Sequence, residues 1–137
     1  MVSLNQLIGQ QVYPSKTDSI YSSILEETRR YQLYLPPTYD QYETSKKYPL
    51  VIILDGDRLF QVTAGNMDFL SKTGKIPESI ILGLSNTNRV RDFTPTISLT
   101  NYEGQNDNSL KDSGGAEKFL QFLQQELIQE IDQKYRT

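Results

Sequence analysis

Two short segments near the start of the chain alternate between apolar and polar side chains. The alternation runs through residues 19–24 and returns in residues 28–35. A period of two is typical of a half-buried β-strand. The polar pair Glu26 and Glu27 separates the two segments, so the pattern predicts an antiparallel hairpin. The hairpin should end at Pro36, because proline has no backbone N–H to donate to a strand ladder.

Two later runs are apolar without alternation. One begins at Leu50 and ends at Leu54, and the other covers residues 79–84. A strand of this kind is apolar on both faces, which predicts a place in the middle of a sheet that is covered on both sides. Residues 59–70 between them show helical spacing, although Gly65 weakens that helix by about 1 kcal/mol relative to alanine. Strand, helix and strand in this order predict a βαβ unit with parallel strands.

The last part of the chain consists of a long polar stretch, residues 85–113, and a strongly amphipathic stretch, residues 114–135. We interpret the first as a loop and the second as a helix. The apolar stripe of the helix recurs every four residues, at Phe119, Leu123, Leu127, Ile131 and Tyr135. The elements together predict an α/β protein with a mixed sheet, an antiparallel hairpin plus parallel strands, and flanking helices. A helix after a parallel strand normally leads into another strand, so residues 1–137 are expected to form one incomplete domain.

Two missing residue types restrict the chemistry. The chain contains no cysteine and no histidine. It therefore has no disulfide, no thiolate nucleophile and no zinc–sulfur site, and a Ser-His-Asp triad cannot be completed within these residues. We expect no cofactor and no metal ion. The absence of cysteine fits a reducing compartment, so we expect a cytoplasmic location, or a periplasmic or secreted one if a leader has been removed.

Charge and hydropathy exclude two classes of partner. The formal charge is −3, from 14 basic and 17 acidic residues, and no basic block is present, so we expect no nucleic-acid partner. No apolar run approaches the length that crosses a bilayer, so we expect no membrane partner. Residues 1–5 also lack the basic and apolar regions of a signal peptide.

Polar residues follow both buried strands. Asp55, Gly56, Asp57 and Arg58 follow the first, and residues 85–96 follow the second. Ligands of open α/β sheets bind at the carboxyl ends of parallel strands, so both segments should meet at one edge. A tight turn at Gly56 would leave the amides of Asp57 and Arg58 free near a helix N-terminus, an arrangement that suits an oxyanion. The alternative, which the spacing alone favours, is that Asp-Gly only forms a turn.

The segment after the second strand contains two arginines, Arg89 and Arg91. A guanidinium group pairs well with a carboxylate or another anionic group of a substrate. The alternative is that one of these arginines pairs with Asp92 or Asp55 and fixes the loop. The spacing alone favours this alternative.

A glycine pair, Gly114 and Gly115, opens the last helix. Backbone amides at such a helix start could cradle an anion. Alternatively, the pair only gives the chain a flexible entry into the helix.

In their order along the chain, these segments resemble the putative esterase family of the α/β-hydrolase superfamily. The resemblance is to the branch that includes esterase D and the enterobactin-esterase-like serine hydrolases. It covers most of the chain beyond the first 20 residues. The matching segments are residues 30–39, 47–56, 80–83, 86–89, 91–95, and 114–119 with the helix that runs on to Thr137.

The resemblance implies the N-terminal half of an α/β-hydrolase fold. It implies that the Asp57 amide is one donor of the oxyanion hole and that Arg58 and the loop from Arg89 to Pro95 line the acyl or alcohol pocket. Family members continue with a Gly-x-Ser-x-Gly elbow that provides the nucleophile, and this chain contains no such motif. The full-length protein would hydrolyse a small-molecule carboxylic ester, and this chain alone should be inactive. The strand from Leu50 to Leu54 would then expose an unpaired edge and could mediate self-association.

Two other classes of function stay open. A buried strand followed by Asp55 and Asp57 is similar to the start of haloacid-dehalogenase-type phosphatases, in which the first aspartate attacks phosphorus and Mg²⁺ bridges. However, that motif usually continues with Gly-Thr, whereas Arg58 and Leu59 follow here. The third class is a non-catalytic binding module that uses the arginine loop to bind an acidic partner.

Overall fold

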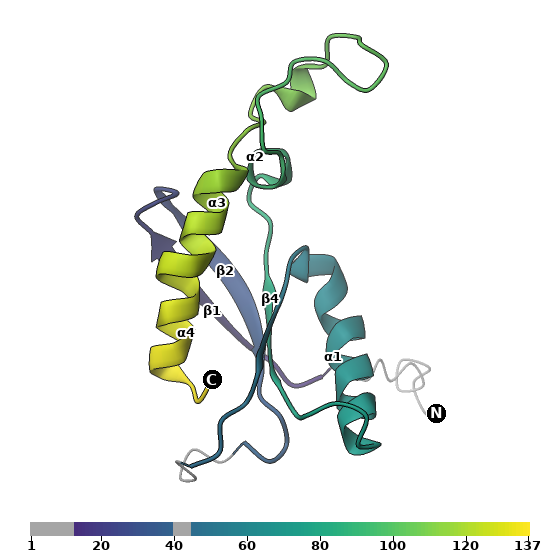
Figure 1. Ribbon diagram of the computed structural model, residues 1–137, viewed down its shortest axis with the longest axis vertical. Helices are drawn as coiled ribbons and strands as arrows, with labels where there is room; N and C mark the ends of the chain where they lie inside the picture. Colours follow the sequence, from purple (N-terminus) through teal and green to yellow (C-terminus); the bar gives the residue numbers. More distant parts are fainter. Residues whose placement is uncertain (1–12, 40–44) are drawn as a thin grey trace, which may run out of the picture.

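The computed structural model describes residues 13–39 and 45–137 as a four-stranded mixed sheet between two helical layers (Figure 1). The strands are β1 (Lys16–Ser22), β2 (Glu27–Tyr34), β3 (Leu50–Ile53) and β4 (Ile80–Leu84), and their order in the sheet is β1-β2-β4-β3. Helix α1 (Gly56–Lys72) covers one face. The other face is covered by one continuous helical rod, formed by α3 (Ala116–Phe122), the π-helical turn η3 (Leu123–Leu127) and α4 (Ile128–Lys134).

The predicted hairpin is confirmed. Strands β1 and β2 pair antiparallel, with Ser22 opposite Glu27 at the turn and Ile20 opposite Arg29. Ile20 is buried while Tyr21 is 64% exposed, as the alternation requires. Glu26 completes the turn with a φ of 56°.

The parallel βαβ unit is also confirmed, since β3 and β4 pair parallel with Ile52 opposite Leu82. The predicted central position of the first apolar run is wrong for the described residues. Strand β4 lies between β2 and β3 and is buried at all five positions, whereas β3 is the edge strand. Three of the four β3 residues are consequently only partly buried.

Two apolar cores occupy the two faces of the sheet. Side chains of β2 and β4 alternate between them: Tyr31 and Leu82 contact the α3–α4 rod, whereas Tyr34 and Ile81 face α1. The α1 side is the smaller core and includes Phe60. This division explains why β4 is apolar at every position, because both of its faces are covered.

The long polar stretch is more ordered than the sequence predicts. It contains the helical turns α2 (Arg89–Phe93) and η2 (Asn108–Leu110), which project beyond the end of the sheet in Figure 1. Both turns have a capping side chain: Asn88 Oδ1 accepts from the Arg91 amide and Asp107 Oδ1 accepts from the Ser109 amide. The single loop of the sequence-based prediction is therefore corrected to a segment that contains two capped turns, which residues 94–107 connect.

The final helix forms at the predicted place but contains a π-helical turn at Leu123–Leu127. Glu126 lies within that turn, and its carboxylate accepts hydrogen bonds from the Ser22 hydroxyl and from the amides of Ser23 and Ile24 in the β1–β2 turn. No helix in the described part of the chain is both long and apolar enough to cross a membrane. The residues used for the signal-peptide expectation lie outside the described ranges.

Candidate active-site edge

The turn after β3 is shaped by Asp55 and Gly56. Asp55 adopts a left-handed backbone conformation with φ 57° and ψ 38°, which aspartate tolerates better than most residues. Its carbonyl oxygen accepts from the amides of Arg58, at 2.9 Å, and Leu59, at 3.0 Å. The predicted free Arg58 amide is therefore wrong, because the first helical turn uses it. The Asp57 amide has no hydrogen-bond acceptor among the described residues, as expected for an early position of a helix.

Gly56 allows the start of α1 to approach β4 closely. A Cβ atom at this position would lie 2.4 Å from the carbonyl carbon of Gly83 and 2.6 Å from the Leu84 nitrogen. Both neighbours are backbone atoms of the central strand, so they cannot rotate away. The Asp-Gly pair therefore does more than reverse the chain: it fixes how closely α1 and its first amides approach the sheet.

Side chains from the two strand ends contact one another, as the sequence predicts. The Asp55 carboxylate accepts from the Asn86 side-chain amide at 2.5 Å and from Arg89 Nε at 3.0 Å. The Asp57 carboxylate accepts from the Asn86 backbone amide at 2.9 Å. Arg89 and, after it, Asn86 hold the pKa of the Asp55 carboxyl below its usual range, so this carboxylate is ionised at neutral pH.

A buried charge cluster lies beneath α2. Arg29 and Asp92 have side chains that are 1% and 0% exposed, and Arg29 Nη1 lies 2.6 Å from Asp92 Oδ2. Arg29 also donates to the Ser85 carbonyl oxygen at 3.0 Å. Its guanidinium carbon lies 5.3 Å from the ring centroid of Phe119, so the cation stacks against an aromatic residue of the core.

Arg91 completes the charge cluster. Its Nη1 and Nη2 donate to the two carboxylate oxygens of Glu27 at 3.0 and 2.6 Å, and its Nε donates to Asp92 at 2.8 Å. The hydrogen bonds with Glu27 raise the pKa of Arg91, whereas Arg91 lowers the pKa of Glu27. This geometry matches the alternative in which arginines of this segment pair with Asp92 and Asp55. It gives no support to a substrate-binding role for Arg91, because the Nε and both terminal nitrogens of its guanidinium donate to carboxylates of the protein.

Arg29 and Glu27 of this edge are not identified by the sequence patterns above, and Asn86 is covered there only as one of residues 85–96. One signal could have identified Arg29: it shares the core face of the alternating strand with Tyr31 and Leu33. Asn86 follows β4 at the edge where ligands bind, and this position alone could have marked it. For Glu27, the sequence indicates only a place in the turn.

The glycine pair before α3 does not cradle an anion. The Gly114 amide donates to the Thr94 hydroxyl at 2.7 Å, and the Gly115 amide donates to the Arg91 carbonyl oxygen at 2.9 Å. Gly114 has a φ of 97°, a conformation that few other residues adopt. The pair therefore anchors α3 to the end of α2.

The lowered pKa of Glu27 predicts an acid-sensitive contribution to stability. The contribution is fully present above the unfolded pKa of 4.5 and is lost as the pH falls through the lower folded pKa. We expect the free energy of unfolding to drop between about pH 5 and pH 3 less steeply in Glu27→Gln than in the wild type. Urea unfolding at several pH values measures this. Identical slopes in the two proteins would show that the Glu27–Arg91 pair contributes nothing.

The chain matches a known family over most of its length. A family model described as Putative esterase matches residues 22–137. Uncharacterized protein YbbA of Bacillus subtilis (strain 168) is 34% identical over 67 residues, which are 49% of this chain and 26% of that protein. The chain therefore spans about a quarter of the length of this relative.

Solved structures agree with the family match. An IroE-like serine hydrolase from Shewanella oneidensis superposes with a TM-score of 0.85 at 38% identity, over 90% of this chain and 40% of that one. The CE1 ferulic acid esterase AmCE1/Fae1A from Anaeromyces mucronatus, solved in complex with ferulic acid, superposes with a TM-score of 0.64 at 24% identity, over 94% of this chain and 46% of that one. The second likeness shows the fold alone.

Proposed function

This chain belongs to the Putative esterase family, and we propose that it is the N-terminal portion of a serine esterase that hydrolyses carboxylic esters through an acyl-enzyme. The described sheet and helices have the α/β-hydrolase fold. The hydrolase from Shewanella oneidensis is similar to 90% of this chain. The mixed sheet places its parallel strand ends, and the polar side chains that follow them, at one edge.

The main support for an ester-cleaving site is the Asp57 amide. It lies at the start of α1, one residue beyond the close approach of Gly56 to β4, and no described residue accepts its hydrogen bond. A helix N-terminus favours negative charge, so this amide suits the oxyanion that forms when a nucleophile attacks an ester carbonyl. Arg58 and Arg89, both exposed at the same edge, would line the acyl or alcohol pocket.

The phosphatase alternative gains no support from the arrangement of charges. The carboxylates of Asp55 and Asp57 accept hydrogen bonds from Asn86, and the guanidinium group of Arg89 lies against Asp55. Among the described residues, no group of three or more acidic, histidine or cysteine side chains is placed to hold a metal ion. The binding-module alternative requires arginines of the loop after β4 that reach solvent, and of Arg89 and Arg91 only Arg89 is largely exposed.

The 137-residue chain is expected to be inactive by itself, because it contains no histidine to act as general base. The measurement is hydrolysis of 4-nitrophenyl acetate by the purified chain, with the urea-unfolded chain as the control for non-specific reaction. Turnover above this control that Arg58→Ala abolishes would contradict the proposal.

A second experiment tests the esterase itself. The chain would be extended with the coding sequence that follows it in the gene, and a fluorophosphonate probe would be applied to the short and the extended proteins. We expect labelling of a serine only in the extended protein, at a Gly-x-Ser-x-Gly elbow. An extended protein that has this elbow and neither labels nor hydrolyses esters would exclude the serine esterase function.

The free edge of β3 is expected to cause self-association of this chain. Among the described strands β3 pairs only with β4, so one row of its backbone donors and acceptors is open. Leu54→Lys places a charge beside this edge at a residue that is already 38% exposed, and it should shift sedimentation toward the monomer. Val62→Lys, on the 57% exposed outer face of α1, is the matched control and should change nothing. A wild-type chain that stays monomeric at high concentration would exclude this association.

A further inference from the structure

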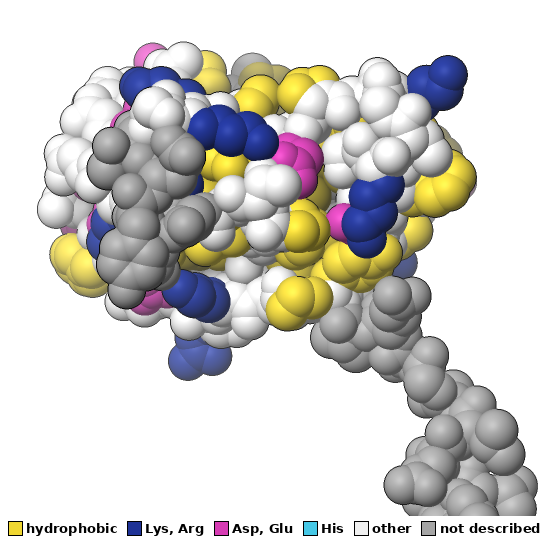
Figure 2. Space-filling view, turned by 90° about the horizontal axis from the view of Figure 1, so that it is seen from below, with side chains coloured by type: hydrophobic (Ala, Val, Ile, Leu, Met, Phe, Trp, Pro, Cys, Tyr) yellow, Lys and Arg dark blue, Asp and Glu magenta, His cyan; other side chains and the backbone are white. Residues whose placement is uncertain are grey.

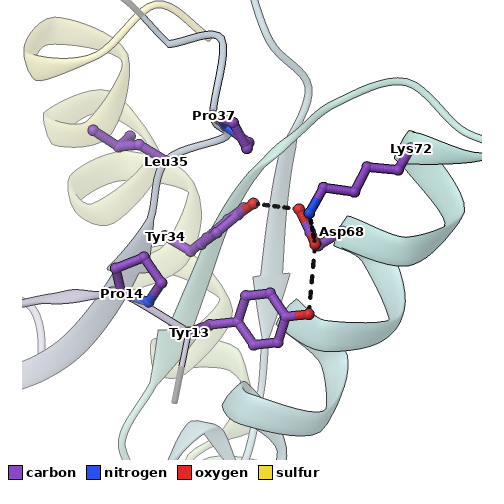
Figure 3. Close-up of a pocket in the computed structure, with 7 residues that line it drawn as sticks. All are labelled: Tyr13, Pro14, Tyr34, Leu35, Pro37, Asp68 and Lys72. Carbon is purple, nitrogen blue, oxygen red and sulfur yellow. Dashed lines mark hydrogen bonds and ion pairs between the residues drawn. The ribbon is translucent and has the colours of Figure 1, made fainter. Parts of the chain in front are cut away.

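The residues that follow β3 and β4, including the proposed oxyanion donor, are called the ester-site edge. A cavity of about 360 Å³ lies at the opposite end of the molecule. Its lining comes from the segment before β1, the end of β2 and the last turns of α1, as Figure 3 shows. The lining residues are Tyr13, Pro14, Tyr34, Leu35, Pro37, Asp68 and Lys72. Gly56 and Asp68 are at opposite ends of α1, about 18 Å apart along a helix that rises 1.5 Å per residue. The cavity is therefore separate from the Asp57 amide, the proposed oxyanion donor.

The polar end of the cavity is organised around Asp68, which is only 7% exposed. Its carboxylate accepts from the Tyr34 hydroxyl at 3.1 Å, from the Tyr13 hydroxyl at 3.5 Å and from Lys72 Nζ at 2.7 Å (Figure 3). The ammonium group of Lys72 is the main cause of a lowered pKa of Asp68, so the carboxylate is ionised at neutral pH.

The remaining walls of the cavity are apolar. The rings of Tyr13 and Tyr34 meet edge to face with centroids 6.0 Å apart, and Pro14, Leu35 and Pro37 complete the lining. In Figure 2, which views this end of the molecule, apolar side chains gather between scattered lysine and arginine side chains. A cavity of this size with apolar walls and a few convergent polar groups is the usual form of a small-molecule site.

The fixed polar groups of the cavity all favour a positively charged ligand. Both tyrosine hydroxyls give their protons to Asp68, so the two phenol oxygens and the carboxylate present only lone pairs to the cavity. The one cation among the lining residues, Lys72, stands on a flexible side chain that is 65% exposed. Its ammonium group pairs with a carboxylate that is only 7% exposed, so it can move into solvent only in exchange for another cation. A ligand cation could then take its place at Asp68 and contact the aromatic faces as well.

We propose that this cavity is a second binding site, for a small organic cation that has an aromatic or short aliphatic body and a terminal ammonium group. The ammonium group displaces Lys72 Nζ from Asp68, and the body lies against the proline and tyrosine walls. Lys72 is accordingly a built-in competitor, and removal of its charge should strengthen binding. The proposal is independent of the ester-cleaving function.

The experiment is an NMR titration of the chain with phenethylammonium at neutral pH, which follows the amides of Tyr34 and Asp68. 2-Phenylethanol is the neutral probe of the same size, and 3-phenylpropanoate is the anionic one. We expect phenethylammonium to bind about tenfold more tightly than the alcohol, because a hydrogen bond to a charged group is worth about one order of magnitude in affinity or more. Asp68→Asn should reduce this preference to about unity, and Lys72→Met should increase the affinity for phenethylammonium severalfold.

Three outcomes would overturn the proposal. Equal affinity for the ammonium and the alcohol would mean that only the apolar walls bind. Tighter binding of 3-phenylpropanoate would mean that Lys72, and not Asp68, selects the ligand. No shift with any probe, in the wild type and in Lys72→Met, would mean that the cavity does not admit ligands. Lys72→Met alters an exposed side chain and should fold normally, so the test remains decisive even if Asp68→Asn does not fold.

Discussion

Replacement of Asp92 by alanine is expected to lower the free energy of unfolding by about 3–5 kcal/mol, the usual cost of removing one partner of a buried ion pair. Arg29, the partner, is only 1% exposed and would keep its charge without the 2.6 Å contact that compensates it. Its remaining partners are Glu27 and the Ser85 carbonyl oxygen. Urea unfolding of wild type and variant measures the difference.

Two further variants distinguish the stability effect of the buried ion pair from that of an exposed ion pair. Glu130→Ala removes a carboxylate from an exposed i,i+4 pair with Lys134 and should cost only about 0.3–0.5 kcal/mol. The double variant Arg29→Met with Asp92→Leu removes both buried charges and should recover much of the loss, because apolar replacements of a buried pair are often neutral. The loss of stability in the double variant is compared with the losses in Arg29→Met and Asp92→Leu. If it equals their sum, the ion pair is not the source of the effect.

The Asp92 variant should also loosen the ester-site edge. Arg29, Asp92 and Arg91 connect β2 to the segment that contains Asn86 and Arg89. Once that connection is broken, we expect faster amide hydrogen exchange in residues 85–93 than in β4. A uniform increase over the whole chain would indicate global destabilisation instead.

Gly56→Ala is expected to destabilise the protein by about 3 kcal/mol, at the upper end of what overpacking of a well-packed site costs. The new Cβ would lie 2.4 Å from a backbone carbon of β4, so α1 must move away from the sheet. The movement would displace the Asp57 amide, the proposed oxyanion donor. In an extended, active protein this variant should therefore lose kcat more than it raises KM, since the interaction forms only in the transition state.

Gly65→Ala is the matched control on the same helix. Its Cβ would meet only the end of the Tyr13 ring, at 3.0 Å, and a ring can shift where backbone cannot. The higher helix propensity of alanine offsets the contact, so the change should stay within about 1 kcal/mol of either sign. A Gly56→Ala protein as stable as Gly65→Ala would show that the close approach of α1 to β4 is not required.

The order of strands and helices could be predicted from the sequence because hydrophobic periodicity is a local property. The alternation around Ile20 and Tyr31 was enough for the hairpin, and the continuous apolar run of β4 was enough for a buried parallel strand. The absence of histidine, a matter of composition, is enough to exclude a complete triad within these residues. The meeting of Asp55 with the segment after β4 followed from the general geometry of parallel sheets.

The tertiary structure alone decided which of the candidate charges are free. Arg29 and Asp92 are 63 residues apart in sequence, and nothing local in either segment indicates that they form a buried pair. In the same way, only the tertiary structure brings Glu126 of the π-helical turn against the β1–β2 turn, and only the sheet order places β3 at an edge. Periodicity records which side of an element is buried, but the partner on that side is chosen by contacts between distant segments. Such contacts pair Arg91 with Glu27 and Asp92, the alternative that the sequence left open for the arginines of this segment.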